Sequence, residues 1–143
     1  MGGTRPAFDP DLLPGLQARA AQLPPLSADT LEQHRRIAVE GTPGDRPADL
    51  TAGGTIRVSE RTVPGPAGAP DLTLLVLSPA DGSGPWPGIY HTHGGGMVMG
   101  TPRSQIEPLL PHVAAGAVLV SVDYRLAPEH PDPAPVEDCY AGL

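Results

Sequence analysis

The sequence predicts a doubly wound α/β fold, in which helices cover both faces of a mostly parallel sheet. Two observations support this class. Apolar residues near the N-terminus recur with the spacing of one helix face, and from residue 56 onward they change to strand patterns. From residue 88 onward the expected strands and helices alternate, which is typical of parallel strands joined by crossover helices.

Two short amphipathic helices are expected near the N-terminus. The first ends at Pro24 and Pro25, because proline cannot continue a helix. The second begins at Asp29, which is in capping-box relation to Glu32, and runs to about Val39. The apolar face of the first helix consists of Leu12, Leu13, Leu16, Ala20 and Leu23.

A linker rich in Pro, Gly and Asp follows over residues 41–54. We therefore expect two parts in the chain. Residues 1–45 hold the two helices and the start of the linker, and residues 46–143 hold the first four strands and the helices beside them.

Four strands are expected after the linker. Each is rich in β-branched or apolar residues, and the last has the continuous apolar character of a buried parallel strand. Turn residues between the first two favour a hairpin-like connection. The predicted strands cover residues 56–63, 72–77, 88–92 and 117–122.

Two further helices are expected among these strands. Residues 106–113 keep helical spacing, with Ser104 and Glu107 in capping-box relation, although two prolines keep the helix short or irregular. The last helix begins near Pro135, because a proline is tolerated in the first turn.

Composition excludes several classes of partner. The formal net charge is −7, no Lys is present, and the nine Arg form no basic stripe that could neutralise phosphates, so we expect no nucleic acid. No apolar run approaches the ~20 residues of a membrane span, and no signal peptide is recognisable. The expected location is therefore the cytoplasm. The single Cys139 cannot form an intrachain disulfide and is interpreted as a small core residue.

One motif points to chemistry. The third predicted strand runs directly into His-Gly-Gly-Gly at residues 93–96. Without Cβ atoms, consecutive glycines can adopt positive φ and bring their N–H groups against a substrate carbonyl. Preorganised N–H donors of this kind stabilise the tetrahedral oxyanion of acyl transfer. The run therefore predicts an oxyanion hole, and a plain flexible turn is the less favoured interpretation.

Two motifs carry a family resemblance. His93 to Gly100 (HGGGMVMG) and Asp123 to Pro131 (DYRLAPEHP) together resemble the hormone-sensitive-lipase group of α/β-hydrolases, the bacterial family IV esterases. The resemblance implies that the N-terminal helices form part of a cap over the active site. It also implies a carboxylic-ester hydrolase that acts on short-chain acyl esters through an acyl-serine, with no cofactor.

The resemblance also assigns roles to residues. His93 is expected to orient the loop by hydrogen bonds and not to act as the general base. Met97 stands where the family usually has an aromatic residue, and we expect it to contact substrate. The expected oxyanion-hole residues are Gly94, Gly95 and Gly96, with Gly94 and Gly95 as the favoured donors.

The nucleophile of such enzymes sits in a Gly-x-Ser-x-Gly elbow, and none of the six serines here has glycines at both elbow positions. Ser83 comes nearest, but Asp81 and Pro85 occupy those positions. We therefore expect a truncated chain with an incomplete sheet, which is inactive by itself. A partner chain carrying the missing half and a homo-oligomer are both left open.

Two other functions remain as alternatives. The same scaffold can serve as a ligand-binding protein without catalysis, since the resembling family includes a plant hormone receptor, or the chain can be an inactive gene remnant. A metal site at His91 and His93 is disfavoured because no further ligand has suitable spacing. The charged residues after the last strand, Asp123, Arg125 and Glu129, are interpreted as a bracing network and not as catalytic acids.

Overall fold

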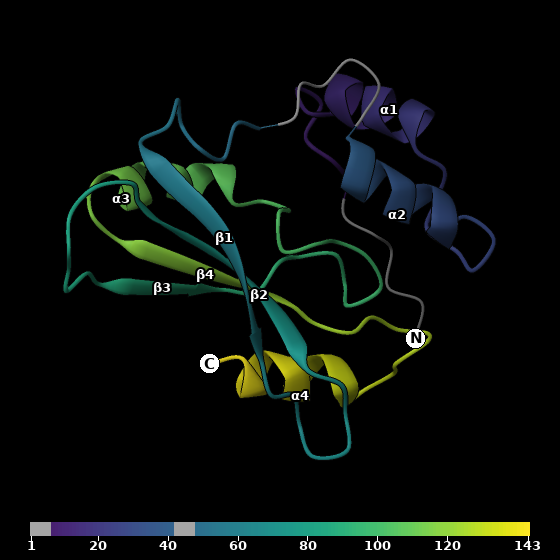
Figure 1. The fold of residues 1–143 in the computed structure, drawn as a ribbon. Coiled ribbons are helices and arrows are strands. Elements are labelled where there is room, and N and C mark those ends of the chain that lie inside the picture. Colours follow the sequence, from purple (N-terminus) through teal and green to yellow (C-terminus); the bar gives the residue numbers. More distant parts are fainter. Residues whose placement is uncertain (1–6, 42–47) are drawn as a thin grey trace.

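The computed structural model describes residues 7–41 and 48–143 (Figure 1). Its centre is a four-stranded sheet with the order β1-β2-β4-β3. β1 (Ile56–Val63) and β2 (Leu72–Pro79) form an antiparallel hairpin, and β2 continues antiparallel to β4 (Val118–Asp123). β3 (Gly88–His91) runs parallel to β4 at the sheet edge.

The α/β class is confirmed, and each strand lies within about two residues of its predicted position. The direction of the strands differs from the prediction. Two of the three strand pairs are antiparallel, so the described sheet is mixed and not mostly parallel. The short connection between β1 and β2 folds the chain straight back into a hairpin, and β2 then pairs antiparallel with β4 while β1 forms the outer edge.

The sheet buries apolar residues on both faces, because successive side chains of a strand point to opposite sides. Leu75, Leu77 and Leu119 face the side covered by α3, where Ile106 and Val113 complete the cluster. The other face is covered by α4, as Figure 1 shows. Its cluster contains Leu72, Leu74, Val122 and Tyr124, with Cys139 packed against it.

The helices beside the sheet are short. A 3₁₀ turn (Glu107–Leu109) leads into α3 (Leu110–Ala114), and α4 spans Ala134–Ala141. The predicted capping box of Ser104 and Glu107 is wrong. The Ser104 hydroxyl accepts the N–H of Thr101 instead, because the two prolines of this segment displace the helix start beyond its reach.

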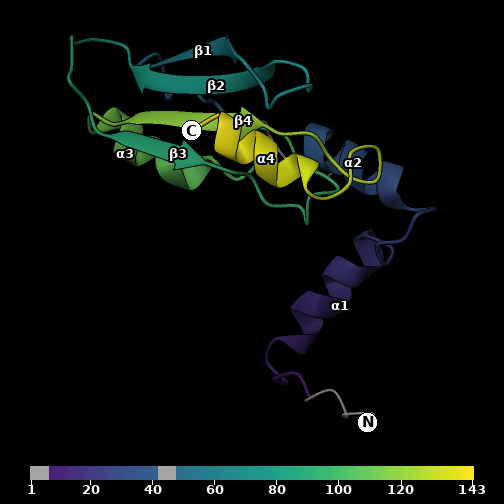
Figure 2. The ribbon, with the colours of Figure 1, turned by 90° about the horizontal axis from the view of Figure 1, so that it is seen from below.

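α1 (Leu13–Gln22) and α2 (Leu31–Glu40) confirm the two predicted N-terminal helices. The capping box at Asp29 is wrong, because Thr30 is the N-cap residue and its side chain makes no cap hydrogen bond. Instead, its hydroxyl accepts the Ser27 N–H and donates to the Pro25 carbonyl. Figure 2 shows α1 projecting away from the sheet, whereas α2 lies beside the loops at one sheet end.

The predicted boundary at residues 45 and 46 lies outside the described residues. The end of the predicted linker belongs to the core, since Leu50 packs in the cluster on the α3 face. Over residues 7–41 and 48–143, no helix combines the length and apolar character needed to cross a membrane.

A buried ion pair joins α4 to the residues after β4. Asp138 is fully buried, and its carboxylate accepts the Arg125 backbone N–H at 2.9 Å, Nε at 2.8 Å and Nη2 at 2.7 Å. Burial alone would raise the pKa of Asp138, but the hydrogen bonds and charge of Arg125 hold this pKa below its usual range. The structural interpretation of Arg125 is therefore confirmed.

We expect the Asp138→Ala variant to lower the free energy of unfolding by about 3–5 kcal/mol, because it leaves the Arg125 guanidinium without its buried partner. Urea unfolding followed by circular dichroism measures the change. The control is Glu137→Ala at the exposed neighbouring position, which should cost less than about 1 kcal/mol. Equal losses in the two variants would contradict this role of the pair.

Candidate active site

The candidate site lies at the carboxyl ends of the parallel strands β3 and β4. The glycine loop (residues 92–100) follows β3, and the post-β4 loop (residues 124–133) follows β4. Ligands of open α/β sheets bind at this end of the strands. A cavity of about 850 Å³ opens here, lined among others by Gly94, Gly95 and Met99 of the glycine loop and by Asp123.

His93 anchors the glycine loop in the protein interior. Its ring is buried and stacks on Tyr124 with a centroid distance of 4.1 Å. The Nδ1 of His93 donates to the Gly94 carbonyl at 3.0 Å, and the Tyr124 hydroxyl donates to the His93 carbonyl at 2.6 Å. Gly100 packs so tightly on the His93 ring that a Cβ there would overlap it. Burial lowers the pKa of His93, which favours the neutral imidazole.

The three glycines of the motif have different environments. The Gly94 N–H donates to Gln105 Oε1 at 3.0 Å, so this donor already has a partner. Gly95 and Gly96 have φ of 127° and 64°, in the region that favours glycine. Within residues 7–41 and 48–143, the N–H groups of these two glycines have no acceptor. Among the three glycines of the motif, these two therefore have N–H groups that are free to meet a ligand.

The turn after the glycines is tight. The N–H groups of Val98 and Met99 both donate to the Gly95 carbonyl at 3.3 Å. A Cβ on Gly95 would overlap the Met99 carbonyl. Met97 has φ of 61°, and its carbonyl accepts the N–H of Ala127 in the post-β4 loop at 2.8 Å. The two loops are therefore bonded to each other.

Only some of the predicted site residues line the cavity. Gly94 and Gly95 line the cavity together with Met99, whereas His93, Gly96 and Met97 are not among its described lining residues. The Met97 side chain is 46% exposed. Sequence reasoning missed Gln105, whose amide occupies the Gly94 donor, and no sequence signal marks it.

Charged groups near the cavity have mixed roles. Asp123 lines the cavity, and burial raises the pKa of its carboxyl group. Glu60 on β1 also lines it and pairs with Arg103 at 3.4 Å. Glu129 pairs with Arg35 on α2 at 2.7 Å, so it braces the post-β4 loop as predicted.

His91 contacts Ser121 Oγ at 2.9 Å, and the described residues hold no cluster of His, Cys, Asp and Glu that could bind a metal.

Strand, glycine loop and helix on this sheet define an α/β protein with a backbone-lined site at the carboxyl ends of its parallel strands. Residues 89–143 match the family model of the α/β-hydrolase fold. The chain has the fold of this family.

Two curated relatives come from Mycobacterium tuberculosis. The chain is 42% identical to Carboxylesterase NlhH over 89 residues, which cover 62% of the chain and 28% of that protein. It is 40% identical to Esterase LipI over 87 residues, or 60% of the chain and 27% of that protein. The matched part thus spans less than a third of either relative.

A solved structure agrees with these relatives. A bacterial heroin esterase superposes with a TM-score of 0.73 and 33% sequence identity, covering 91% of the chain and 41% of that protein. Chain and neighbour therefore share the same partial fold.

Acidification below about pH 6.5 should destabilise the chain. Burial lowers the pKa of both His91 and His93 in the folded chain. At a pH between this lowered pKa and the ordinary pKa of histidine, the unfolded chain therefore binds more protons than the folded chain. Their contribution to stability is therefore complete above about pH 6.5 and decreases as the pH falls toward the folded pKa. Thermal melts from pH 8 to 5, with NMR titration of the imidazole C–H signals, test this. A flat melting temperature, with both imidazoles titrating at or above the ordinary pKa, would contradict it.

Proposed function

We propose that the glycine loop is the oxyanion hole of a carboxylic-ester hydrolase that acts through an acyl-serine. One observation carries this proposal: the Gly95 and Gly96 N–H groups have no acceptor in the described chain, and Gly95 borders the cavity. Such donors stabilise the negative charge that develops on a carbonyl oxygen, because they need no reorganisation when it forms. The names of the relatives, which are esterases, support the same reaction class.

The geometry selects among the predicted donors. Gly94 donates to Gln105 and would have to break that bond to reach a substrate. We therefore assign the two oxyanion contacts from this loop to Gly95 and Gly96, where the sequence favoured Gly94 and Gly95. His93 has a positioning role in this proposal, because its contacts are with the loop backbone and Tyr124.

The proposed reaction needs a nucleophile that the 143 residues do not offer in elbow context. A serine from outside this segment would attack the ester carbonyl, and the alcohol would leave as the acyl-serine forms. Water would then release the acid and restore the serine. The proposed substrate is a small ester with a short acyl chain, and the mechanism uses no cofactor.

The 143 residues alone should show no turnover of p-nitrophenyl acetate. An oxyanion hole without nucleophile and base leaves only a small residual rate over water. Absorbance of p-nitrophenolate measures turnover, and mass spectrometry after treatment with a fluorophosphonate detects a reactive serine. Stoichiometric phosphonylation of any of the six serines, with turnover above that of the denatured chain, would contradict this prediction.

The donor assignment can be tested in a chimera in which residues 1–143 replace the corresponding N-terminal segment of the mycobacterial carboxylesterase NlhH. We expect Gly95→Ala to lower kcat by about 10²–10³, as loss of an oxyanion donor does, because the added Cβ would overlap the Met99 carbonyl and displace the N–H. Steady-state kinetics with p-nitrophenyl esters measure the effect.

Gly94→Ala is the matched control. Its Cβ would meet only the end of the flexible Gln105 side chain, 2.7 Å away, so kcat should fall much less. If Gly95→Ala raised KM and left kcat unchanged, the glycines would form a binding turn and not an oxyanion hole. A folded chimera without turnover would instead favour a ligand-binding protein.

A further inference from the structure

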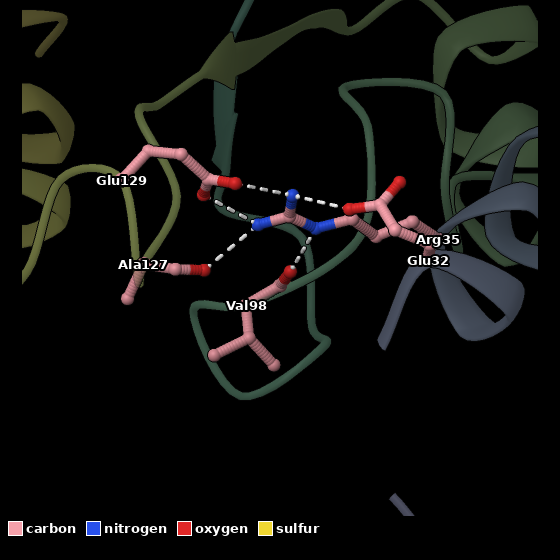
Figure 3. A network of polar contacts seen from close by, with 5 residues as sticks. All are labelled: Glu32, Arg35, Val98, Ala127 and Glu129. Atoms are coloured by element: carbon pink, nitrogen blue, oxygen red, sulfur yellow. Dashed lines mark hydrogen bonds and ion pairs between the residues drawn. The ribbon is translucent and has the colours of Figure 1, made fainter. Parts of the chain in front are cut away.

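Arg35 on α2 uses every donor of its guanidinium group. Nε donates to the Val98 carbonyl at 2.8 Å, and Nη2 donates to the Ala127 carbonyl at 2.9 Å (Figure 3). Nη1 and Nη2 also bind the two carboxylate oxygens of Glu129, at 2.8 and 2.7 Å, and Nη1 reaches Glu32 at 3.2 Å. Five N–H groups thus meet five acceptors, which is the full capacity of an arginine.

Two of these acceptors are backbone carbonyls from the two loops of the site. Val98 belongs to the tight turn that closes on the Gly95 carbonyl, and Ala127 belongs to the post-β4 loop. Since the Ala127 N–H donates to the Met97 carbonyl, the contacts close a ring from Arg35 through both loops and back. Figure 3 shows the guanidinium between the two carbonyls.

We propose that Arg35 is a positioning residue of the oxyanion hole, which fixes the turn of residues 95–99 against the post-β4 loop and so sets the direction of the Gly95 and Gly96 N–H groups. This inference rests on the proposed function. It also assigns α2 a role in the site, because that helix supplies the residue that holds the turn.

The carbonyl contacts carry this role more than the ion pair does. The Glu129 side chain is 54% exposed, and exposed pairs contribute little by themselves. The Arg35 side chain is only 20% exposed, so its bonds to the carbonyls are shielded from water. Glu129 orients the planar guanidinium toward the carbonyls, and a lysine, with three donors on one nitrogen, could not meet all five acceptors.

The network persists over a wide pH range. The hydrogen bond from Arg35 lowers the pKa of Glu129 to about 2 and raises the pKa of Arg35. A depressed carboxyl pKa means that the contribution of Glu129 is complete above its ordinary pKa of 4.5 and is lost only as the pH falls toward 2. Positioning by Arg35 is therefore independent of pH where esters are assayed.

The kinetic test uses the chimera with Arg35→Met. Methionine keeps an unbranched apolar stem like that of arginine but removes all five N–H donors. Because a displacement near 1 Å can cost about 10²-fold in rate, we expect kcat to fall by about 10- to 100-fold while KM changes less than about threefold. The affinity for a trifluoromethyl ketone, which mimics the tetrahedral intermediate, should fall in parallel. Arg35→Lys should restore part of kcat, and added ethylguanidine should restore part of it in Arg35→Ala.

Arg36→Met is the matched control, since Arg36 is the exposed neighbour on the same helix and should tolerate the change without effect on kcat. Glu129→Gln keeps the two carbonyl contacts of Arg35 and should retain most of kcat. If Arg35→Met lowered only the melting temperature, or if Arg36→Met reduced kcat equally, the positioning role would be wrong. The Lys variant decides the question if the Met variant does not fold.

A second measurement does not depend on turnover. The Ala127 amide donates within the ring, and the Val98 and Met99 amides donate to the Gly95 carbonyl in the turn that the ring holds, so hydrogen exchange reports on both. We expect these amides to exchange at least about tenfold faster in Arg35→Met than in Arg36→Met. Unchanged exchange would overturn the inference even in an inactive chimera. An inactive parent chimera with the expected exchange would instead overturn the proposed function alone.

Discussion

The parallel pairing of β3 and β4 is the constraint on which the site depends. Because the two strands run side by side in the same direction, the glycine loop and the post-β4 loop leave the sheet at the same edge. They must then satisfy each other's backbone groups, since polar groups withdrawn from water need partners. The Tyr124 hydroxyl meets the His93 carbonyl, and the Ala127 N–H meets the Met97 carbonyl. Both contacts join the two loops that follow these parallel strands.

These contacts also explain how the chain maintains an unusual backbone. Met97 has a positive φ although it is not glycine, a conformation that costs free energy and persists only when its surroundings determine it. The Ala127 N–H and the neighbouring Arg35 contact hold this part of the turn from two sides. The strain lies next to the free donors of Gly95 and Gly96, where a rigid backbone would serve an oxyanion hole.

The elements could be predicted from the sequence because they depend on local patterns. Alternating apolar residues gave the strands, and the His-Gly-Gly-Gly run predicted a loop with exposed N–H groups. Contacts between distant segments could not be predicted in this way. Nothing near Gln105 indicates that its amide occupies the Gly94 N–H, and nothing near Arg35 indicates carbonyl acceptors 63 and 92 residues away. The capping boxes failed because local contacts competed with them: Thr30 takes the N-cap position in place of Asp29, and the Ser104 hydroxyl accepts the Thr101 N–H.

The distant contacts matter because glycine cannot fix its own direction. A run of three glycines loses more backbone entropy on ordering than any other tripeptide, so its N–H groups point to one place only if other residues hold them there. His93 and Tyr124 hold the start of the run, Gln105 holds Gly94, and Arg35 holds the turn beyond Gly96. Between these anchors, the N–H groups of Gly95 and Gly96 have no acceptor in the described part of the chain. A loop restrained on both sides in this way is preorganised, and preorganisation distinguishes an oxyanion hole from a flexible turn of the same sequence.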